Sequence, residues 1–291
     1  MTGSIPVLDI GGTHVTAALV DPLSWQLLGQ PVRLALDAHG TADEILATLV
    51  RAAARLDARE GAAWGVAMPS PFDYDRGIAL FEGVDKFESL HGVDVAAALR
   101  AALPRPAAIG FLNDADAFAL GEFAVIGHGR LVGLTLGTGV GSGWIVDGQI
   151  VADGPGVPPE GRAHLLRIDG VALEDRMSRR AIRRAYLDAT GSDADVLEIC
   201  DRARAGEAVC AAVLRSALRD LGSAIGPSAV EFGADVIVVG GSMAGSWDLL
   251  EPWFREGAGD PLPPLRRSSL GEHAPLIGAA RYVGAEPASR D

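Results

Sequence analysis

The residues best suited to chemistry follow an apolar segment at residues 107–112. There the chain reads Asn113-Asp114-Ala115-Asp116, directly before an apolar-periodic segment that predicts a helix. A carboxylate at this place could accept a proton from an attacking hydroxyl group, while the Asn113 amide orients the same substrate. Asp is also a common helix cap, so Asp114 or Asp116 could instead serve only to cap the helix. Position alone leaves both roles open for Asp114.

Two glycine-rich turns could bring backbone N–H groups close to phosphate oxygens. One is DIGGT at residues 9–13, and the other is LGTGVGSG at residues 136–143. Either turn alone is equally typical of plain hairpin geometry. Two such turns in corresponding places of a repeated pattern are better explained by one ligand held between two halves. A third pair, Gly240-Gly241, suits the base and ribose of a nucleotide, or simply a tight turn.

The elements around these turns repeat along the chain. Residues 5–10, 14–20 and 24–34 predict an antiparallel meander, followed by a helix from a capping box at Thr41 to a stop at Gly61. Aligning residues 10–21 with residues 136–147 matches Gly11 with Gly137, which indicates a duplication. Further helices are predicted at residues 94–103, 174–188, 206–232, 247–254 and from 275 onward, and further strands at 63–68, 107–112, 131–136, 143–146 and 234–241.

Composition narrows the class of protein. The 25 basic and 38 acidic residues give a net charge of −13, which would repel nucleic acid and anionic lipid. No apolar run approaches the roughly 18 residues that span a bilayer, and the start lacks the pattern of a signal peptide, so we expect a cytoplasmic protein. The 291 residues suffice for two domains. Cys200 and Cys210 are predicted to be buried thiols in one helical stretch.

The order of these motifs resembles the ROK family of bacterial sugar kinases. The resemblance runs from about residue 5 to 284. It implies a two-domain α/β fold of the actin/hexokinase (ribonuclease H-like) type, with ATP and sugar in the interdomain cleft. The expected domains are residues 1–112 plus 275–291 and residues 113–274. The segments that carry the resemblance are DIGGT, the PSP loop at 69–71, NDAD followed by ALGE, LGTGVGSG, LEDRMSRRAI at 173–182, VIVVGGS at 236–242 and LIGAA at 276–280.

The resemblance also implies roles for individual residues in an ATP-dependent sugar kinase. Asp114 would be the base that deprotonates the sugar hydroxyl, and Asp9 would help to place Mg²⁺ through water. A homodimer is implied as well. The implied substrate-binding residues are Ser70, Asn113, Asp114, Glu160, His164 and Glu174. The implied nucleotide-binding residues are Gly11, Gly12, Thr13, Thr138, Gly139 and Gly241.

The sequence departs from the family pattern around the substrate. The family commonly binds a structural zinc through a His and three Cys, but residues 164–174 contain no cysteine, so we predict no zinc site. His164 is then either a sugar ligand or a structural residue. Glu160 is one residue out of register, and the loop at 83–87 lacks the family's Asn, although Phe87 could replace its aromatic residue.

The two glycine-rich turns at residues 9–13 and 136–143 keep the family pattern. The sequence therefore predicts transfer of the ATP γ-phosphoryl group to a hydroxyl, of the primary 6-OH type, on a hexose such as glucose. One alternative is a kinase for a modified sugar, such as an amino sugar or a cyclitol. An alternative of another class is a non-catalytic sugar-binding or regulatory ROK protein. The sequence does not rank ATP against other phosphoryl donors such as polyphosphate.

Overall fold

The structure, a computed structural model, describes residues 3–284 and divides into two compact units. Unit 1 comprises the residues up to Val125 together with those from Glu272 onward, and unit 2 comprises Ile126–Gly271. The domain boundaries given by the sequence, at 112/113 and 274/275, stay a prediction. The structure itself groups residues 113–125 and 272–274 with unit 1.

Unit 1 is built on a five-stranded mixed sheet with the strand order β3-β2-β1-β4-β7. β2 runs antiparallel to β1 and β3, whereas β1, β4 and β7 are parallel. The carboxyl ends of the three parallel strands therefore meet at one edge of the sheet, where ligands of such sheets usually bind. The strands are β1 (Ile5–Ile10), β2 (His14–Val20), β3 (Leu27–Ala35), β4 (Ala63–Met68), the hairpin β5 (Phe72–Asp73) and β6 (Ile78–Ala79), and β7 (Ala108–Asn113).

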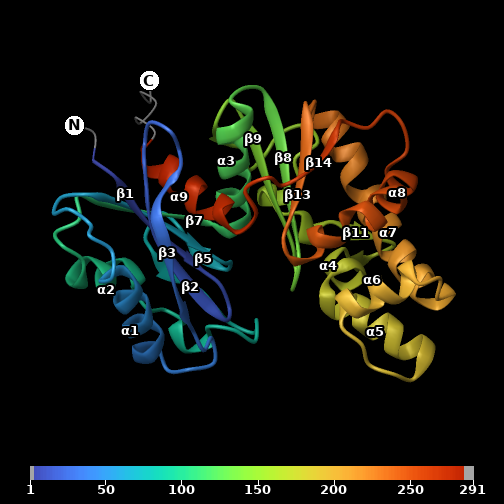
Figure 1. Cartoon of the computed structure of the whole chain (residues 1–291), viewed down its shortest axis with the longest axis horizontal. Helices are drawn as coiled ribbons and strands as arrows, with labels where there is room; N and C mark the ends of the chain where they lie inside the picture. The colour runs from blue at the N-terminus through green and yellow to red at the C-terminus, as the bar shows by residue number, and fades with distance from the viewer. Residues whose placement is uncertain (1–2, 285–291) are drawn as a thin grey trace. The chain divides into compact units, whose positions relative to one another are not determined.

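Helices cover both faces of this sheet (Figure 1). On one face, Leu8 and Ile10 of β1 share a buried cluster with Ile45 of α1 and Leu99 of α2. On the other face lies α9, so close that a Cβ atom added at Gly65 would lie 2.2 Å from the Ala279 carbonyl oxygen. The helices of this unit are α1 (Ala42–Ala53), α2 (Val95–Ala102), α3 (Asp114–Ile126) and α9 (Ala274–Gly284), with short 3₁₀ turns at Glu88–Leu90 and Gly271–His273.

The sheet of unit 2 repeats that of unit 1. Its order is β10-β9-β8-β13-β14, with β9 antiparallel to β8 and β10, and with β8, β13 and β14 parallel. This shared topology supports the duplication that the aligned glycine turns indicate. The strands are β8 (Arg130–Leu136), β9 (Val140–Val146), β10 (Gln149–Ile150), the hairpin β11 (Arg167–Ile168) and β12 (Val171–Ala172), β13 (Val236–Gly240) and β14 (Leu265–Arg267).

The helices of unit 2 enclose a single buried cluster that includes Trp144 of β9, Leu214 of α7 and Phe254 of α8. They are α4 (Glu174–Met177), α5 (Arg179–Thr190), α6 (Val196–Arg204), α7 (Ala208–Phe232) and α8 (Trp247–Ala258), with 3₁₀ turns at Pro159–Gly161, Ala163–Leu165 and Ser242–Ser246. No helix within residues 3–284 is long and apolar enough to cross a membrane.

Three expectations about helices were wrong. The segment 174–188 is two helices, because Ser178 is extended (φ −67°, ψ 161°) and its hydroxyl accepts a hydrogen bond from the Ala181 N–H of α5. Cys200 and Cys210 lie on α6 and α7, which Gly206 separates with a φ of +92°. Both cysteines are buried and form no disulfide, as expected.

The third wrong expectation concerns the end of the first helix. The capping box at Thr41 and Glu44 is confirmed, but α1 ends at Ala53 and does not reach Gly61. The Gly61 N–H instead bonds the carbonyls of Pro104 and Arg105, because Gly61 belongs to the turn that leads into β4.

The tight packing of α9 can be tested at Gly278. A Cβ atom there would lie 1.7 Å from the Ala117 carbonyl oxygen of α3, a contact that only a backbone shift can relieve. We expect Gly278→Ala to lower the free energy of unfolding by roughly 3 kcal/mol, the upper range of overpacking costs, as measured by urea denaturation. At Gly245 an added Cβ meets no atom within 4 Å. Gly245→Ala is therefore the control, and an equal loss in both variants would contradict this account.

Candidate active site

Three of the predicted residues gather at the carboxyl edge of the unit 1 sheet. Asp9 lies near the end of β1, Asn113 is the last residue of β7, and Asp114 is the first residue of α3. The negative charge of Asp114 is felt at Asp9, whose pKa is raised to about 7 by burial first and by Asp114 second. The Arg33 guanidinium opposes this shift, and Glu272 adds to it. Two carboxylates therefore share one region of negative potential.

Asn113 shares with Asp114 the capping hydrogen bond that the sequence left open for Asp114. The Ala115 N–H lies 3.0 Å from Asn113 Oδ1 and 2.9 Å from Asp114 Oδ1. Because Asn113 directly precedes α3, its side chain stands in the usual N-cap position. Asn113 is buried, and Asp116 is also buried, which differs from an exposed cap. Asp114 is exposed at the first helical position.

Tyr74 fixes the orientation of Asn113, and sequence reasoning missed it. Asn113 Nδ2 donates to the Tyr74 hydroxyl at 3.2 Å, and this hydroxyl donates to the Met68 carbonyl at 3.1 Å. Met68 pairs with Asn113 across β4 and β7, so one phenol joins the ends of both strands. Tyr74 directly follows β5, and no local signal in the sequence shows that its side chain reaches β7. Ser70, in the loop after β4, is exposed.

The first glycine turn lies at the same edge, between β1 and β2. Its Gly11 N–H donates to the His14 carbonyl at 2.9 Å, and Gly11 and Thr13 are exposed. The Thr13 hydroxyl lies 2.9 Å from His14 Nδ1. A Cβ atom at Gly12 would lie 3.1 Å from Lys86 Nζ. The loop at residues 83–87 thus reaches the turn that was predicted to hold phosphate.

In unit 2 the two remaining glycine turns adjoin each other. Gly241 has a φ of +83°, and a Cβ atom there would lie 2.4 Å from the Leu136 carbonyl oxygen. A Cβ atom at Gly137 would lie 3.3 Å from Ser242 Oγ. Both turns follow the parallel neighbours β8 and β13 at the carboxyl edge of this sheet. Thr138 is exposed at the tip of its turn.

Glu174 lies against the second glycine turn. A Cβ atom at Gly139 would lie 2.3 Å from Glu174 Oε1. The structure therefore brings together a residue predicted to bind sugar and a residue predicted to bind phosphate. A carboxylate repels phosphate at this distance. The carboxylate of Glu174 therefore stands where the prediction for Gly139 would place a phosphate group.

Glu160 and His164 lie on a third segment of unit 2. Glu160 is exposed with a φ of 57°, and His164 is partly buried. Ser142 of β9 holds this segment, because its hydroxyl donates to the Gly161 carbonyl at 2.7 Å and accepts from the Ala163 N–H at 2.8 Å. Ser142 is fully buried, and its role was missed because nothing in the GSG sequence shows its distant partners.

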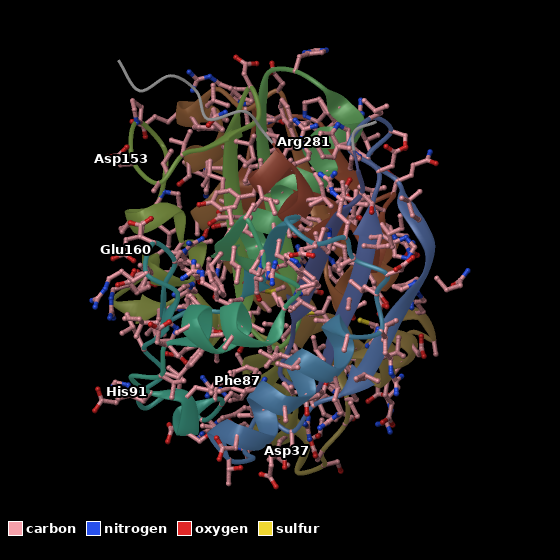
Figure 2. The ribbon with its side chains drawn as sticks, turned by 90° about the vertical axis from the view of Figure 1, so that its left-hand side faces the viewer. Asp37, Phe87, His91, Asp153, Glu160 and Arg281 are labelled. Carbon is pink, nitrogen blue, oxygen red and sulfur yellow. The ribbon has the colours of Figure 1, made fainter. Side chains whose placement is uncertain are left out.

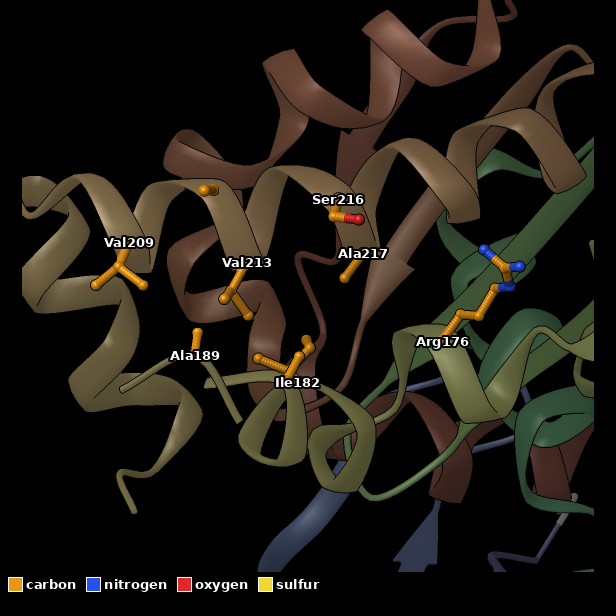
Figure 3. Close-up of a pocket in the computed structure, with 9 residues that line it drawn as sticks. Arg176, Ile182, Ala189, Val209, Val213, Ser216 and Ala217 are labelled. Carbon is orange, nitrogen blue, oxygen red and sulfur yellow. The ribbon is translucent and has the colours of Figure 1, made fainter. Parts of the chain in front are cut away.

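A cavity of about 330 Å³ between α5 and α7 is not a rival site for this chemistry (Figure 3). It is lined mainly by small apolar residues, among them Ile182, Val213 and Ala217. Its charged group, Arg176, is paired with Asp220 at 3.0 Å. No predicted site residue is among its described lining residues.

No zinc-type cluster is found in the described part of the chain. Within residues 3–284, no group of three or more His, Cys, Asp or Glu side chains is placed to hold a metal ion. The missing zinc site itself stays a prediction.

Two mixed sheets of equal topology, each with a glycine turn after its central strand, define an α/β protein of the actin/hexokinase-like class. The model of the ROK family matches residues 6–286, and the chain belongs to this family. A glucokinase of Thermotoga maritima is 26% identical over 95% of this chain and 96% of its own. A kanosamine kinase of Amycolatopsis mediterranei is 28% identical over 95% of both chains. The crystal structure of a ROK hexokinase from Thermus thermophilus is similar with a TM-score of 0.79 and 27% identity, covering 96% of this chain and 97% of that one. The chain is an ATP-dependent sugar kinase.

The raised pKa of Asp9 predicts a pH-dependent stability. The folded protein binds this proton more tightly than the unfolded chain, so the contribution is full below pH 3.8 and is lost as the pH rises through about 7. Asp9→Asn removes the ionisation. At pH 8 we expect the variant to be more stable than the wild type by on the order of 2–4 kcal/mol, with the difference vanishing near pH 4, in urea denaturation.

Asp21→Asn is the matched control, because the pKa of Asp21 is lowered by hydrogen bonds from the Leu23 N–H and the Ser24 hydroxyl. Its loss should destabilise the protein above pH 4, which is the opposite sign. A parallel response of the two variants to pH would show that Asp9 does not carry the penalty.

Proposed function

We propose that this kinase transfers the γ-phosphoryl group of ATP to a primary hydroxyl of a hexose such as glucose, with Asp114 as the general base. The observation that supports this assignment is the arrangement of Asn113, Asp114 and Asp9 around the start of α3. The Ala115 N–H meets Asn113 Oδ1 in the N-cap position as well as Asp114 Oδ1, so the cap does not depend on Asp114, which is exposed and raises the pKa of Asp9. Capping α3 does not require a carboxylate at Asp114. Its negative charge is unfavourable for Asp9, whose pKa it raises.

In the proposed reaction the acceptor hydroxyl attacks the γ-phosphorus in line. The new O–P bond forms as the bond between the γ-phosphorus and the β,γ-bridging oxygen breaks, and ADP leaves. Asp114 takes the hydroxyl proton, and Asn113, held by Tyr74, orients the acceptor. Ser70, Glu160, His164 and Glu174 are the further proposed sugar contacts. Gly12, Thr13, Thr138 and Gly139 would hold phosphates, Gly11 would form the first turn beside the nucleotide with its own N–H bonded to the His14 carbonyl, and Gly241 would lie near the adenosine.

The residues around Asp9 fit a magnesium ion. Asp9 is a partly buried carboxylate whose charge is disfavoured by burial and by Asp114, and a cation would relieve both effects. Mg²⁺ usually keeps several waters and takes one or two carboxylates plus substrate phosphates, so it needs no larger cluster. When bound, the ion would neutralise phosphate charge during transfer. Asp9 would hold it through water.

Two further statements about the protein stay proposals. A homodimer is implied by the resemblance to the family, and a cytoplasmic location is predicted by the sequence. Neither enters the chemistry above.

The role of Asp114 is tested by Asp114→Asn. We expect kcat to fall roughly 10²- to 10⁴-fold, because the amide cannot accept the proton, while the affinity for the ATP analogue AMPPNP is retained. The measurement is a coupled ADP-release assay together with calorimetric titration of the analogue. Asp43→Asn changes an exposed acidic residue in the first turn of α1 and is the control for a charge lost at a helix start. Near-normal turnover in Asp114→Asn would rule out the assignment.

The second candidate is a kinase for a modified sugar, such as an amino sugar or a cyclitol. The similarity to a kanosamine kinase over 95% of both chains favours it. The altered loop at residues 83–87 and the exposed Glu160 also fit a changed acceptor.

A substrate panel separates these two candidates. Glucose, mannose, fructose, amino sugars and cyclitols are compared by kcat/KM, with the phosphorylated position mapped by NMR. We expect the highest kcat/KM for glucose and the phosphate on its 6-position. A preference of an amino sugar over glucose would move the assignment to the second candidate, and phosphate on another carbon would refute the primary hydroxyl.

A further inference from the structure

Lys86 is the only lysine in the 291-residue sequence, and it lies beside the first glycine turn. A Cβ atom at Gly12 would lie 3.1 Å from Lys86 Nζ and 3.1 Å from its Cδ, so the end of the side chain covers this glycine. The neighbouring Gly11 and Thr13 are exposed. An ammonium group and the backbone N–H groups of a turn therefore occupy one small region of unit 1.

The backbone on both sides of Lys86 is held in an unusual conformation. Asp85 has a φ of 69° and Phe87 a φ of 60°, the left-handed region that bulky side chains rarely adopt. Phe87, labelled in Figure 2, is buried with its ring 5.2 Å from that of Phe81, and its N–H donates to the Ala38 carbonyl at 2.8 Å. The Asp85 N–H donates to Glu88 Oε1 at 3.1 Å. These contacts fix the loop so that Lys86 points at Gly12.

The charge of Lys86 has no partner within the described residues. Its ammonium group forms no hydrogen bond or ion pair there, although the side chain is partly buried and the net charge is −13. The cation that lowers the pKa of Asp9 is Arg33. Ordering a long side chain beside a glycine costs conformational entropy, which no contact of the ammonium group in the described part of the chain offsets. An anionic ligand at the exposed turn would supply that contact through a charge-assisted hydrogen bond.

We propose that Lys86 contacts the terminal phosphoryl group of the nucleoside triphosphate and neutralises the charge that develops as this group is transferred. The proposal rests on the proposed function, which places phosphates at Gly12 and Thr13. Lys serves phosphate as a point charge, and cations aimed at the transferring group act most strongly in the transition state. Lys86 would then stabilise the reacting phosphoryl group without touching the proton that Asp114 accepts.

Single substitutions test the role in catalysis. Lys86→Met should lower kcat roughly 10²- to 10³-fold, as for the loss of one donor to a developing anion, with the KM for sugar and the affinity for ADP little changed. Lys86→Arg should recover part of the loss because it restores the charge. Arg76→Met is the control, since Arg76 is an exposed cation in the β5–β6 hairpin of the same unit. A wild-type kcat in Lys86→Met, or a loss confined to the KM for sugar, would overturn the proposal.

The single lysine also allows a test on the wild-type protein that does not depend on activity. Acetylation with an N-hydroxysuccinimide ester modifies only Lys86 and the α-amino group, and peptide mass spectrometry separates the two. AMPPNP should slow acetylation of Lys86 and leave the α-amino group unaffected, ADP should protect less, and glucose alone should not protect.

The outcomes of this labelling separate the two proposals. If AMPPNP protects Lys86 but the protein phosphorylates no sugar of the panel, the proposed contact between Lys86 and the nucleotide stands. The proposed transfer to a hexose is then refuted. An active kinase in which AMPPNP gives no protection would refute the Lys86 contact and leave the proposed function standing. Protection by glucose alone would make Lys86 a sugar-binding residue and overturn the proposal.

Discussion

The placement of Asp114 depends on one close contact between two helix backbones. Added Cβ atoms would lie 2.0 Å from the Ala274 carbonyl oxygen at Gly121 of α3, and 1.7 Å from the Ala117 carbonyl oxygen at Gly278 of α9. Glycines on both helices therefore let α3 and α9 touch backbone to backbone. Because α9 also lies on Gly65 of the sheet, it fixes α3 relative to β1 and β7. Helix α9 thus sets the position of Asp114 at the start of α3.

The site holds negative charge at the expense of stability. Asp9 is partly buried near Asp114, and the ion pair between Arg33 and Glu272 at 2.7 Å brings one cation and one further anion into its surroundings. Like charges that share a site disfavour each other's ionised form. Such an arrangement lowers the stability of the fold at neutral and higher pH, and strongly shifted pKa values of this kind cluster at functional sites. The cation of the sheet that opposes this charge is Arg33 on β3, and it only partly offsets the raised pKa of Asp9.

Local signals in the sequence were sufficient for much of the fold and for part of the candidate site. The meander, the capping box at Thr41 and the helix start after Asn113 follow from residue types within a few positions of each other. Contacts between segments distant in the sequence could not be predicted from it. No pattern near Tyr74 or Ser142 shows which carbonyl each hydroxyl meets, and the proximity of Glu174 to Gly139 depends on the break at Ser178. Helical periodicity continues through Ser178, so only the N-cap chemistry of that residue marks the boundary.

The two sheets of equal topology differ in the charge that lies beside their glycine turns. Both sheets send their central strand into a glycine turn, but the side chain that covers the turn differs in sign: the ammonium of Lys86 covers Gly12, and the carboxylate of Glu174 covers Gly139. Two turns in corresponding places of the two sheets thus stand beside side chains of opposite charge. The sign of the charge beside each turn is therefore set by one side chain that lies outside the repeated strands.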